Sequence, residues 1–223
     1  MDSSDIIIQA KQLVRKYGDR RILAGIDIKV HRGERVALMG PSGAGKSTLL
    51  NCIGGIDQPD EGQVFLGGVE LSSLGTDQLA KIRREQISHI FQFFHLLPTL
   101  TVTENIEFPM LLNEVPERER KKRVSLLLKE VGLESRRDAL PDELSGGEMQ
   151  RVAVARALGV EPCVILADEP TGNLDSRTGQ LVLELIKETT ESRNIALILV
   201  THSKTATRIC HRIVHIEDGR LKS

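Results

Sequence analysis

The segment GPSGAGKS at residues 40–47 carries residue types that can grip phosphate. It follows the apolar run VALM and precedes the helix-like run STLLNCIGG, the context that a phosphate loop requires. Gly40, Gly43 and Gly45 let the backbone turn tightly and aim N–H groups at phosphate oxygens, and the following helix offers its positive end. By composition alone the pattern arises by chance in on the order of one chain in a hundred, before this context is required. We therefore expect a site for a nucleoside triphosphate.

Two side chains of this segment have individual roles. Lys46 is expected to reach the β- and γ-phosphates, and the Ser47 hydroxyl is expected to ligate Mg²⁺, which prefers oxygen ligands. The candidate phosphate-binding residues are Gly40, Pro41, Ser42, Gly43, Ala44, Gly45, Lys46, Ser47 and Thr48.

A second candidate site lies in VILADEP at residues 164–170. Asp168 and Glu169 follow a buried apolar run, and open parallel sheets bind ligands at the carboxyl ends of their strands. Asp168 is expected to hold Mg²⁺ through water, and Glu169 to polarise the attacking water as a general base. The alternative is a solvated pair of carboxylates that opens a turn before Pro170, which would be the preferred interpretation without the phosphate loop.

The elements that position these residues read as an α/β fold. The runs at 36–39, 164–167 and 195–200 are apolar, rich in β-branched residues and without alternation, as in strands buried on both faces of a parallel sheet. The stretches 6–15 and 22–31 alternate better and predict an antiparallel side sheet. A helix is expected from about Ser176 to Glu191, with one apolar side formed by Leu181, Val182, Leu185, Ile186 and Thr189.

Strand signals disappear between about residues 93 and 156, which predicts a helical lobe inserted into the α/β domain. Four prolines are expected to break its helices, namely Pro98, Pro109, Pro116 and Pro141. The expected division of the single domain is 1–92 with 157–223 for the α/β core and side sheet, and 93–156 for the helical lobe.

Composition excludes several classes of protein. The 30 basic and 31 acidic residues nearly cancel, and aromatic residues make up only 3% of the chain, so neither a polyanion nor stacked single-stranded bases are expected as the partner. The three cysteines have no metal-type spacing, and an odd number argues against a complete set of disulfides. No stretch of 18 apolar residues occurs, so we expect a chain that does not itself span a membrane.

The segment LSGGEMQRVAVARAL at residues 144–158 resembles the signature motif of ATP-binding cassette (ABC) proteins, and it lies between the phosphate loop and the acidic strand, as in that family. The resemblance spans essentially the whole chain. It includes an adenine-stacking Tyr17, Gln92 at the glutamine loop, Ser145 to Glu148 at the signature, and the switch histidine His202. It implies ATP as the nucleotide, ATP hydrolysis, and a phosphate-loop NTPase (RecA-like) core with a parallel sheet, an antiparallel side sheet and an inserted helical subdomain.

Ser145, Gly146 and Gly147 precede a helix-like run and so form a second helix N-terminus that can bind an anion. In the family, the signature of one cassette covers the γ-phosphate held by the phosphate loop of another. The resemblance therefore implies a dimer, most simply of two copies. On its own, the segment would be interpreted as a flexible turn with an ordinary helix cap.

Four other positions depend on the resemblance for their roles. Gln92 is expected to sense Mg²⁺ and the attacking water, and His202 to contact the γ-phosphate, although a lone Gln or His is more often an ordinary surface or partnered side chain. Tyr17 could instead be a packed aromatic residue beside Gly18. Asp175 matches the loop that crosses the dimer, and its alternative is a helix N-cap.

Within the family, the chain looks like the LolD/MacB branch of lipoprotein-release and macrolide-export ATPases, on the strength of TGNLD at 171–175 and the stretch 91–110. The signature has Glu148 where many members have Gln, and Ala167 replaces a larger aliphatic residue; neither change removes a catalytic group.

In that branch the cassette drives a membrane partner, and here the membrane segments are expected on a separate transmembrane permease subunit that docks near residues 91–112. The alternative is that these residues are the core of the helical lobe. The expected location is the cytoplasmic face of the cell membrane, held there through the permease. An ATPase of a cell-division membrane complex remains an alternative, and an ABC ATPase of DNA repair or translation is disfavoured by the single phosphate loop and the absence of a coiled-coil or zinc insert.

Overall fold

The apolar runs predicted as buried strands form the middle of a six-stranded sheet in the computed structural model, which describes residues 5–222. The strand order is β10–β9–β3–β8–β7–β6, and all neighbours are parallel except β10, which pairs antiparallel with β9. The strands are β3 (Arg35–Met39), β6 (Ile87–Phe91), β7 (Val164–Asp168), β8 (Ala196–Val200), β9 (Arg212–Glu217) and β10 (Arg220–Lys222).

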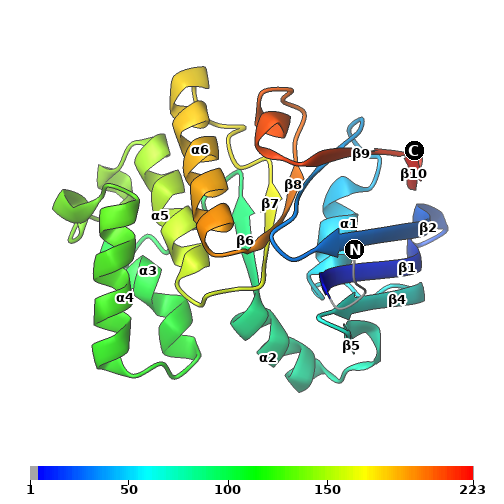
Figure 1. Ribbon diagram of the computed structural model, residues 1–223, viewed down its shortest axis with the longest axis horizontal. Coiled ribbons are helices and arrows are strands. Elements are labelled where there is room, and N and C mark those ends of the chain that lie inside the picture. The colour runs from blue at the N-terminus through cyan, green and yellow to red at the C-terminus, as the bar shows by residue number, and fades with distance from the viewer. Residues whose placement is uncertain (1–4, 223) are drawn as a thin grey trace.

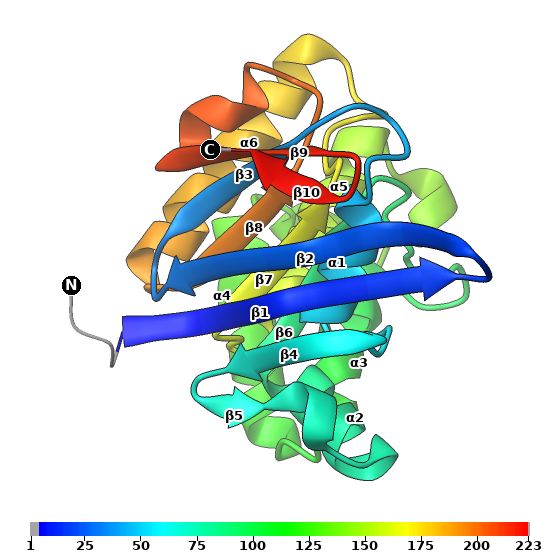
Figure 2. The ribbon, with the colours of Figure 1, turned by 90° about the vertical axis from the view of Figure 1, so that its right-hand side faces the viewer.

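A second, antiparallel sheet is built from the N-terminal hairpin, as the alternating pattern predicted. Its order is β2–β1–β4–β5. The strands are β1 (Ile6–Tyr17), β2 (Arg20–His31), β4 (Glu61–Leu66) and β5 (Val69–Glu70). Figure 2 shows the long strands β1 and β2 of this sheet in front of the first helix, with strands β6, β7 and β8 further from the viewer.

The helices are α1 (Lys46–Ile53), α2 (Thr76–Gln86), α3 (Val102–Leu112), α4 (Glu117–Glu130), α5 (Gly146–Leu158) and α6 (Ser176–Ser192). Helices α3, α4 and α5 lie between β6 and β7 in the sequence and gather at one side of the molecule, at the left of Figure 1. Among residues 5–222, no helix has both the length and the apolar character that a bilayer crossing demands.

Two hydrophobic cores cover the two faces of the parallel sheet. Because side chains alternate along a strand, Ile198 of β8 packs with α1 and the side sheet, whereas its neighbours Leu197 and Leu199 pack with helices α3 to α6. The same alternation holds in β7. Burial on both faces explains why these strands lack a polar face in the sequence.

The prolines of the helical lobe have different outcomes. Pro98 lies in the loop before α3, Pro116 is the N-cap of α4, and Pro141 opens a short 3-10 turn. Pro109, however, lies inside α3, so the predicted break at this position was wrong. Proline removes one backbone donor from a helix, and α3 continues because its buried face, including Ile106 and Met110, packs into the core.

Helix α6 was predicted correctly within one residue, but one side chain of its expected apolar face is misplaced. Val182, Ile186 and Thr189 are buried, whereas Leu181 is 62% exposed. The buried stripe is completed by Leu183, one residue further along the helix. Helix α5 continues to Leu158, so the expected division at residues 156 and 157 falls within its last turn.

Candidate active site

The carboxyl ends of four parallel strands bring the predicted site residues to one edge of the sheet. Ladder pairs align Phe91 with Asp168, Asp168 with Val200, and Val200 with Leu38. Each strand then leads into a site segment: β3 into the phosphate loop, β6 into Gln92, β7 into Glu169, and β8 towards His202. Residues far apart in sequence therefore meet because parallel strands end together.

These residues line an open cleft of about 500 Å³. The predicted residues in its lining are Tyr17, Ser42, Gly43, Gly45, Lys46, Ser47, Thr48, Gln92, Asp168, Glu169 and His202. The other lining residues are Arg20, Ile22, Phe91, Phe93, His95 and Val200. The cleft thus brings together the phosphate loop, the acidic residues at the end of β7, and Tyr17, Gln92 and His202, which were expected from the resemblance.

The phosphate loop ends in a helix whose N-terminus is not capped by a side chain. Gly45 is the N-cap of α1 and has a φ of 102°, a left-handed conformation that favours glycine. The first turn of α1 contains no acidic residue. Its backbone N–H groups and its positive dipole end are therefore available to an anion in the cleft.

Lys46 bridges the loop from inside. Its Nζ donates hydrogen bonds to the carbonyl oxygens of Gly40 (2.9 Å) and Pro41 (2.8 Å). Burial lowers the pKa of Lys46 below its ordinary value, and the carboxylates of Glu169 and Asp168 oppose that shift. The ammonium group is thus held at the phosphate loop, where it interacts electrostatically with the carboxylates of Asp168 and Glu169.

Ser47 and Asp168 meet across the two motifs. The Ser47 hydroxyl Oγ donates to Oδ2 of Asp168 at 2.7 Å. This contact joins the first helix of the chain to the acidic strand, 121 residues later. A hydroxyl and a carboxylate at this separation are the two protein oxygens expected around Mg²⁺.

Glu169 has an unusual backbone conformation for a residue with a side chain. Its φ is 46°, and the turn is held by hydrogen bonds from Glu169 N to Val200 O (3.0 Å) and from Gly172 N to Glu169 O (3.0 Å). Its carboxylate atom Oε1 is buried, makes no hydrogen bond, and lies 3.4 Å from Nε2 of His202. A left-handed non-glycine residue costs about 1–3 kcal/mol, which surrounding structure must offset and which is common at functional sites.

Gln92 lines the cleft and also pairs with a residue of the loop after β7. Its Nε2 donates to Oδ1 of Asn173 at 2.9 Å, and Nδ2 of Asn173 donates back to the carbonyl oxygen of Gln92 at 3.1 Å. Asn173 was not identified in the sequence as a site residue, because no motif marks an amide 81 positions away as a partner of Gln92.

Tyr17 lines the cleft and is 48% exposed, so its ring is not buried in a core. Its hydroxyl donates to Oδ2 of Asp57 at 2.6 Å, which raises the pKa of the phenol. The Arg15 guanidinium lies 4.8 Å from the ring centroid. The ring is therefore held in place while part of it stays available to a flat ligand.

The signature segment forms a helix N-terminus, as predicted, but a capped one. Ser145 is the N-cap of α5, and Gly146 and Gly147 already belong to the helix, so the flexible-turn part of the alternative is wrong and the ordinary cap is present. Oε2 of Glu148 accepts hydrogen bonds from the Ser145 backbone N (2.9 Å) and Oγ (2.7 Å). These bonds lower the pKa of Glu148.

Asp175 is the N-cap of α6, which is the alternative that its sequence left open. Its Oδ1 accepts from the backbone N–H groups of Arg177 and Thr178, both at 3.0 Å. Hydrogen bonding with Thr178, through its side chain and its backbone, lowers the pKa of Asp175, and the Arg177 backbone bond adds to this shift.

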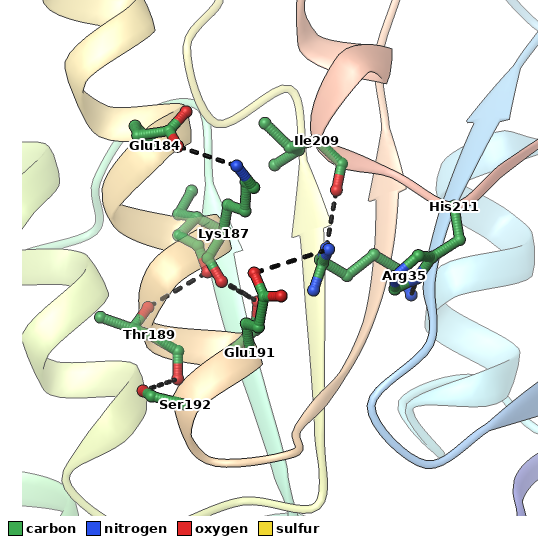
Figure 3. A network of polar contacts seen from close by, with 10 residues as sticks. Arg35, Glu184, Lys187, Thr189, Glu191, Ser192, Ile209 and His211 are labelled. Atoms are coloured by element: carbon green, nitrogen blue, oxygen red, sulfur yellow. Dashed lines mark hydrogen bonds and ion pairs between the residues drawn. The ribbon is translucent and has the colours of Figure 1, made fainter.

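The segment that follows β8 includes His202 and is held at its far end by Arg35, at the start of β3. Figure 3 shows the contacts of Arg35. The buried guanidinium donates from Nε to Ile209 O at 2.7 Å and lies 3.9 Å from the Glu191 carboxylate. The backbone N of Arg35 donates to Nδ1 of His211 at 2.9 Å. The far end of the segment after β8 is thus tied to β3 and to the end of α6.

Comparison with known proteins identifies the family. The ABC transporter family matches residues 23–172, about two thirds of the chain. The chain belongs to the ABC transporter family.

Relatives of this ABC cassette include the lipoprotein-releasing system ATP-binding protein LolD of Pseudomonas fluorescens, 43% identical over 98% of both chains. The macrolide export ATP-binding/permease protein MacB of Vibrio parahaemolyticus is 45% identical over 98% of this chain, which spans only 34% of MacB. Among solved structures, the dimeric cassette MJ0796 bound to ADP and Pi superposes with a TM-score of 0.87 at 39% identity, covering 97% of each chain.

The ABC cassette is therefore an ATP-hydrolysing, nucleotide-binding subunit of the LolD/MacB branch that powers a membrane transporter. The phosphate-loop NTPase fold, with a parallel sheet, a side sheet and helices, is confirmed by the structure and by its solved relatives.

Proposed function

We propose that this chain works as one half of a paired ATPase, in which each copy completes the ATP site of the other. The observation that carries the proposal is the position of the signature motif: within residues 5–222, neither Ser145 nor the two glycines after it line the cleft of their own chain. A helix N-terminus outside the cleft can reach a γ-phosphate there only from a second copy. The dimeric state of the solved relatives supports the same arrangement.

The protein oxygens in the cleft suit Mg²⁺ as the metal. The Ser47 hydroxyl and the Asp168 carboxylate are in contact, and the Gln92 amide lines the same cleft. Mg²⁺ is usually bound by one or two protein side chains together with substrate phosphates and water, and the Ser47 and Asp168 oxygens would be the protein part of such a set. When bound, Mg²⁺ would neutralise charge on the β- and γ-phosphates.

Each side chain of the cleft then has a defined task. Lys46 and the N-terminus of α1 bind the phosphates, and Tyr17 stacks on the adenine. Glu169 polarises the attacking water, and His202, 3.4 Å from its carboxylate, holds the γ-phosphate side of the site. Asp175 caps α6 at the loop that would cross to the second copy.

The membrane partner is a separate permease that docks on the segment 91–112. Several apolar side chains of this segment are exposed, which supports docking, whereas others are buried in the helical lobe. The exposed set is Phe93, Leu97, Phe108, Leu111 and Leu112. The lobe 93–156 would move with this partner, on the inner face of the membrane, in a complex that releases lipoproteins or exports a related amphiphile.

Co-purification from solubilised membranes tests the partner. A chain with Leu111→Ser and Leu112→Ser, two exposed residues of the segment that do not line the cleft, should lose a copurifying multispan polypeptide while it retains ATP binding. Retention of the same polypeptide would contradict docking on this segment.

The paired ATPase is tested by Glu169→Gln. Removing the base should lower turnover by about 10²- to 10⁴-fold while nucleotide stays bound. Light scattering should then show a dimer with excess ATP and Mg²⁺, because each ATP contacts both copies of the chain only in the closed dimer. The matched control is Glu188→Gln, an exposed carboxylate on α6, which should leave turnover unchanged. A monomer with ATP, or unchanged turnover in Glu169→Gln, would refute the proposal.

A further inference from the structure

Gln92 and Asn173 connect two loops near the cleft. Both ends of the Asn173 side-chain amide form hydrogen bonds with Gln92. Asn173 lies between β7 and α6, and Gln92 is the first residue after β6. Asn173 accepts from the Gln92 side chain at 2.9 Å and donates to the Gln92 backbone at 3.1 Å. A pair in which each residue both gives and receives a hydrogen bond has a defined orientation.

That orientation decides which end of the Gln92 amide is the oxygen. A backbone carbonyl only accepts, so the atom of Asn173 that faces Gln92 O must be its nitrogen Nδ2. The other end of the Asn173 amide is then the oxygen Oδ1, which requires a donor, and the facing atom of Gln92 is the nitrogen Nε2. Within residues 5–222, no hydrogen bond engages Oε1 of Gln92, which belongs to a residue lining the cleft.

The neighbouring glycine makes room for this arrangement. A Cβ on Gly172 would lie 2.8 Å from Nε2 of Gln92, closer than real Cβ contacts, and 3.0 Å from Cδ, which is unusually tight. The Gln92 amide therefore packs directly against the backbone that carries Asn173. The steric contact and one hydrogen bond act on the Gln92 side chain, and the second hydrogen bond fixes the Asn173 amide on the Gln92 backbone.

We propose that Asn173 is a positioning residue that holds the Gln92 amide with its oxygen, and not its nitrogen, available to the divalent cation of the cleft. Only the oxygen of an amide can ligate Mg²⁺. Without Asn173, the amide can rotate and present NH₂ to the cation in part of the population. The inference rests on the proposed role of Gln92 as a residue that senses the metal.

The same pair could instead only tie two surface loops together, because Asn173 is exposed. A merely structural pair would affect thermal stability and would not change Mn²⁺ binding by way of the Gln92 amide. An orienting pair acts through the Gln92 amide alone. The two interpretations are separated by combining substitutions at both positions.

The experiment measures Mn²⁺ binding by electron paramagnetic resonance in the ATP-loaded Glu169→Gln protein, so that activity is not the readout. Mn²⁺ takes oxygen ligands like Mg²⁺. Supporting residues of metal ligands typically change affinity about 10- to 100-fold; for this exposed pair we expect Asn173→Ala to weaken Mn²⁺ binding about 3- to 10-fold. ATP binding without metal should be unchanged.

Second substitutions sharpen the test. In a Gln92→Ala background, Asn173→Ala should cause no further loss, because no amide remains to be oriented. In a Gln92→Glu background both ends of the side chain are oxygen, so Asn173→Ala should be neutral or should strengthen Mn²⁺ binding. The matched control is Gln86→Ala, an exposed amide at the opposite end of β6, which should have no effect.

The outcomes distinguish the inference from the proposed function. If Gln92→Ala weakens Mn²⁺ binding and Asn173→Ala does not, the positioning role is refuted while the role of Gln92 stands. An equal loss from Asn173→Ala in all three backgrounds also refutes it. If Gln92→Ala itself leaves Mn²⁺ binding unchanged, the proposed role of Gln92 fails.

Discussion

Two helix N-termini of this chain are assigned to the same phosphate, and they are built differently. The N-terminus of α1 begins at Gly45, without a side-chain cap and without an acid in its first turn. The N-terminus of α5 begins at Ser145 and contains Glu148, whose carboxylate closes a capping box with Ser145. The N-terminus of α1 is open to an anionic ligand, whereas the N-terminus of α5 already contains the carboxylate of Glu148.

The difference teaches what each terminus is suited to do. An open N-terminus exposes several backbone donors, so α1 can bind phosphate within a single chain. At α5, the carboxylate already offsets the helix dipole and repels a second anion. The signature helix is therefore capped within its own chain, and in the proposed dimer it would attract the γ-phosphate more weakly than α1 does.

The largest effect is expected from Gly45→Ala, which breaks the open terminus. Alanine strains a φ of 102°, and its Cβ would lie 3.0 Å from Ile22 O and from Cδ2 of Leu23. Left-handed strain costs about 1–3 kcal/mol, which corresponds to roughly a 5- to 150-fold loss if it falls on the nucleotide-binding conformation. Equilibrium binding of a fluorescent ATP analogue measures it.

Gly75→Ala is the control for that substitution. Gly75 is also a helix N-cap, of α2, but its φ of −70° suits alanine and no atom lies within 4 Å of the added Cβ. Its nucleotide affinity should equal that of the unchanged chain. Equal, small losses from both glycines would mean that the conformation of Gly45 is not what makes the α1 terminus a phosphate site.

A smaller and opposite effect is expected from Glu148→Gln, which opens the capped terminus. Removing the carboxylate should cost stability, since the charge–dipole interaction at a partly exposed helix end contributes about 0.3–1 kcal/mol. It should also remove repulsion of the γ-phosphate. In the Glu169→Gln background, we expect the dimer to form at about 2- to 5-fold lower ATP concentration, by light scattering.

Helix α3 provides a matched capping box outside the cleft. Thr101 and Glu104 repeat the contacts of Ser145 and Glu148, with Thr101 N and Oγ1 donating to Glu104 Oε2 at 2.7 and 2.9 Å. Glu104→Gln should therefore lower stability without changing the ATP concentration for dimerisation. If both substitutions shifted dimerisation equally, the effect of Glu148 would come from general charge and not from its place in the signature.

The smallest effect is in the pH dependence of stability. Hydrogen bonds from Ser145 hold the pKa of Glu148 below its ordinary value, so the unfolded chain binds this proton more readily. The stabilisation by Glu148 is fully present above an unfolded pKa of about 4.3 and is lost as the pH falls through the lower folded pKa. The stability difference between the unchanged chain and Glu148→Gln should shrink below about pH 4.5, by urea unfolding, and a difference that grew with acidity would contradict this assignment.

Much of the fold followed from local patterns, and the exceptions have identifiable causes. The strands β3, β7 and β8 were predictable because each is a continuous apolar run. Strand β4, helix α2 and strands β9 and β10 were not predicted, since their short or strongly polar segments carry no clear period. Pro109 was taken as a break because local propensity does not register the packing of α3 against the core.

The sequence by itself determined the chemistry of the phosphate loop and of the acidic strand. In those segments the ligands, the turn and the adjoining helix or strand are contiguous, so spacing alone places them. Only the tertiary structure decided which distant side chains meet: Ser47 with Asp168, Tyr17 with Asp57, and Gln92 with Asn173. The pairs Ser47–Asp168 and Gln92–Asn173 arise because parallel strands end at one edge of a sheet, whereas Tyr17 meets Asp57 because the side sheet packs against α1. Which side chains touch depends on how the loops pack, which local patterns do not record.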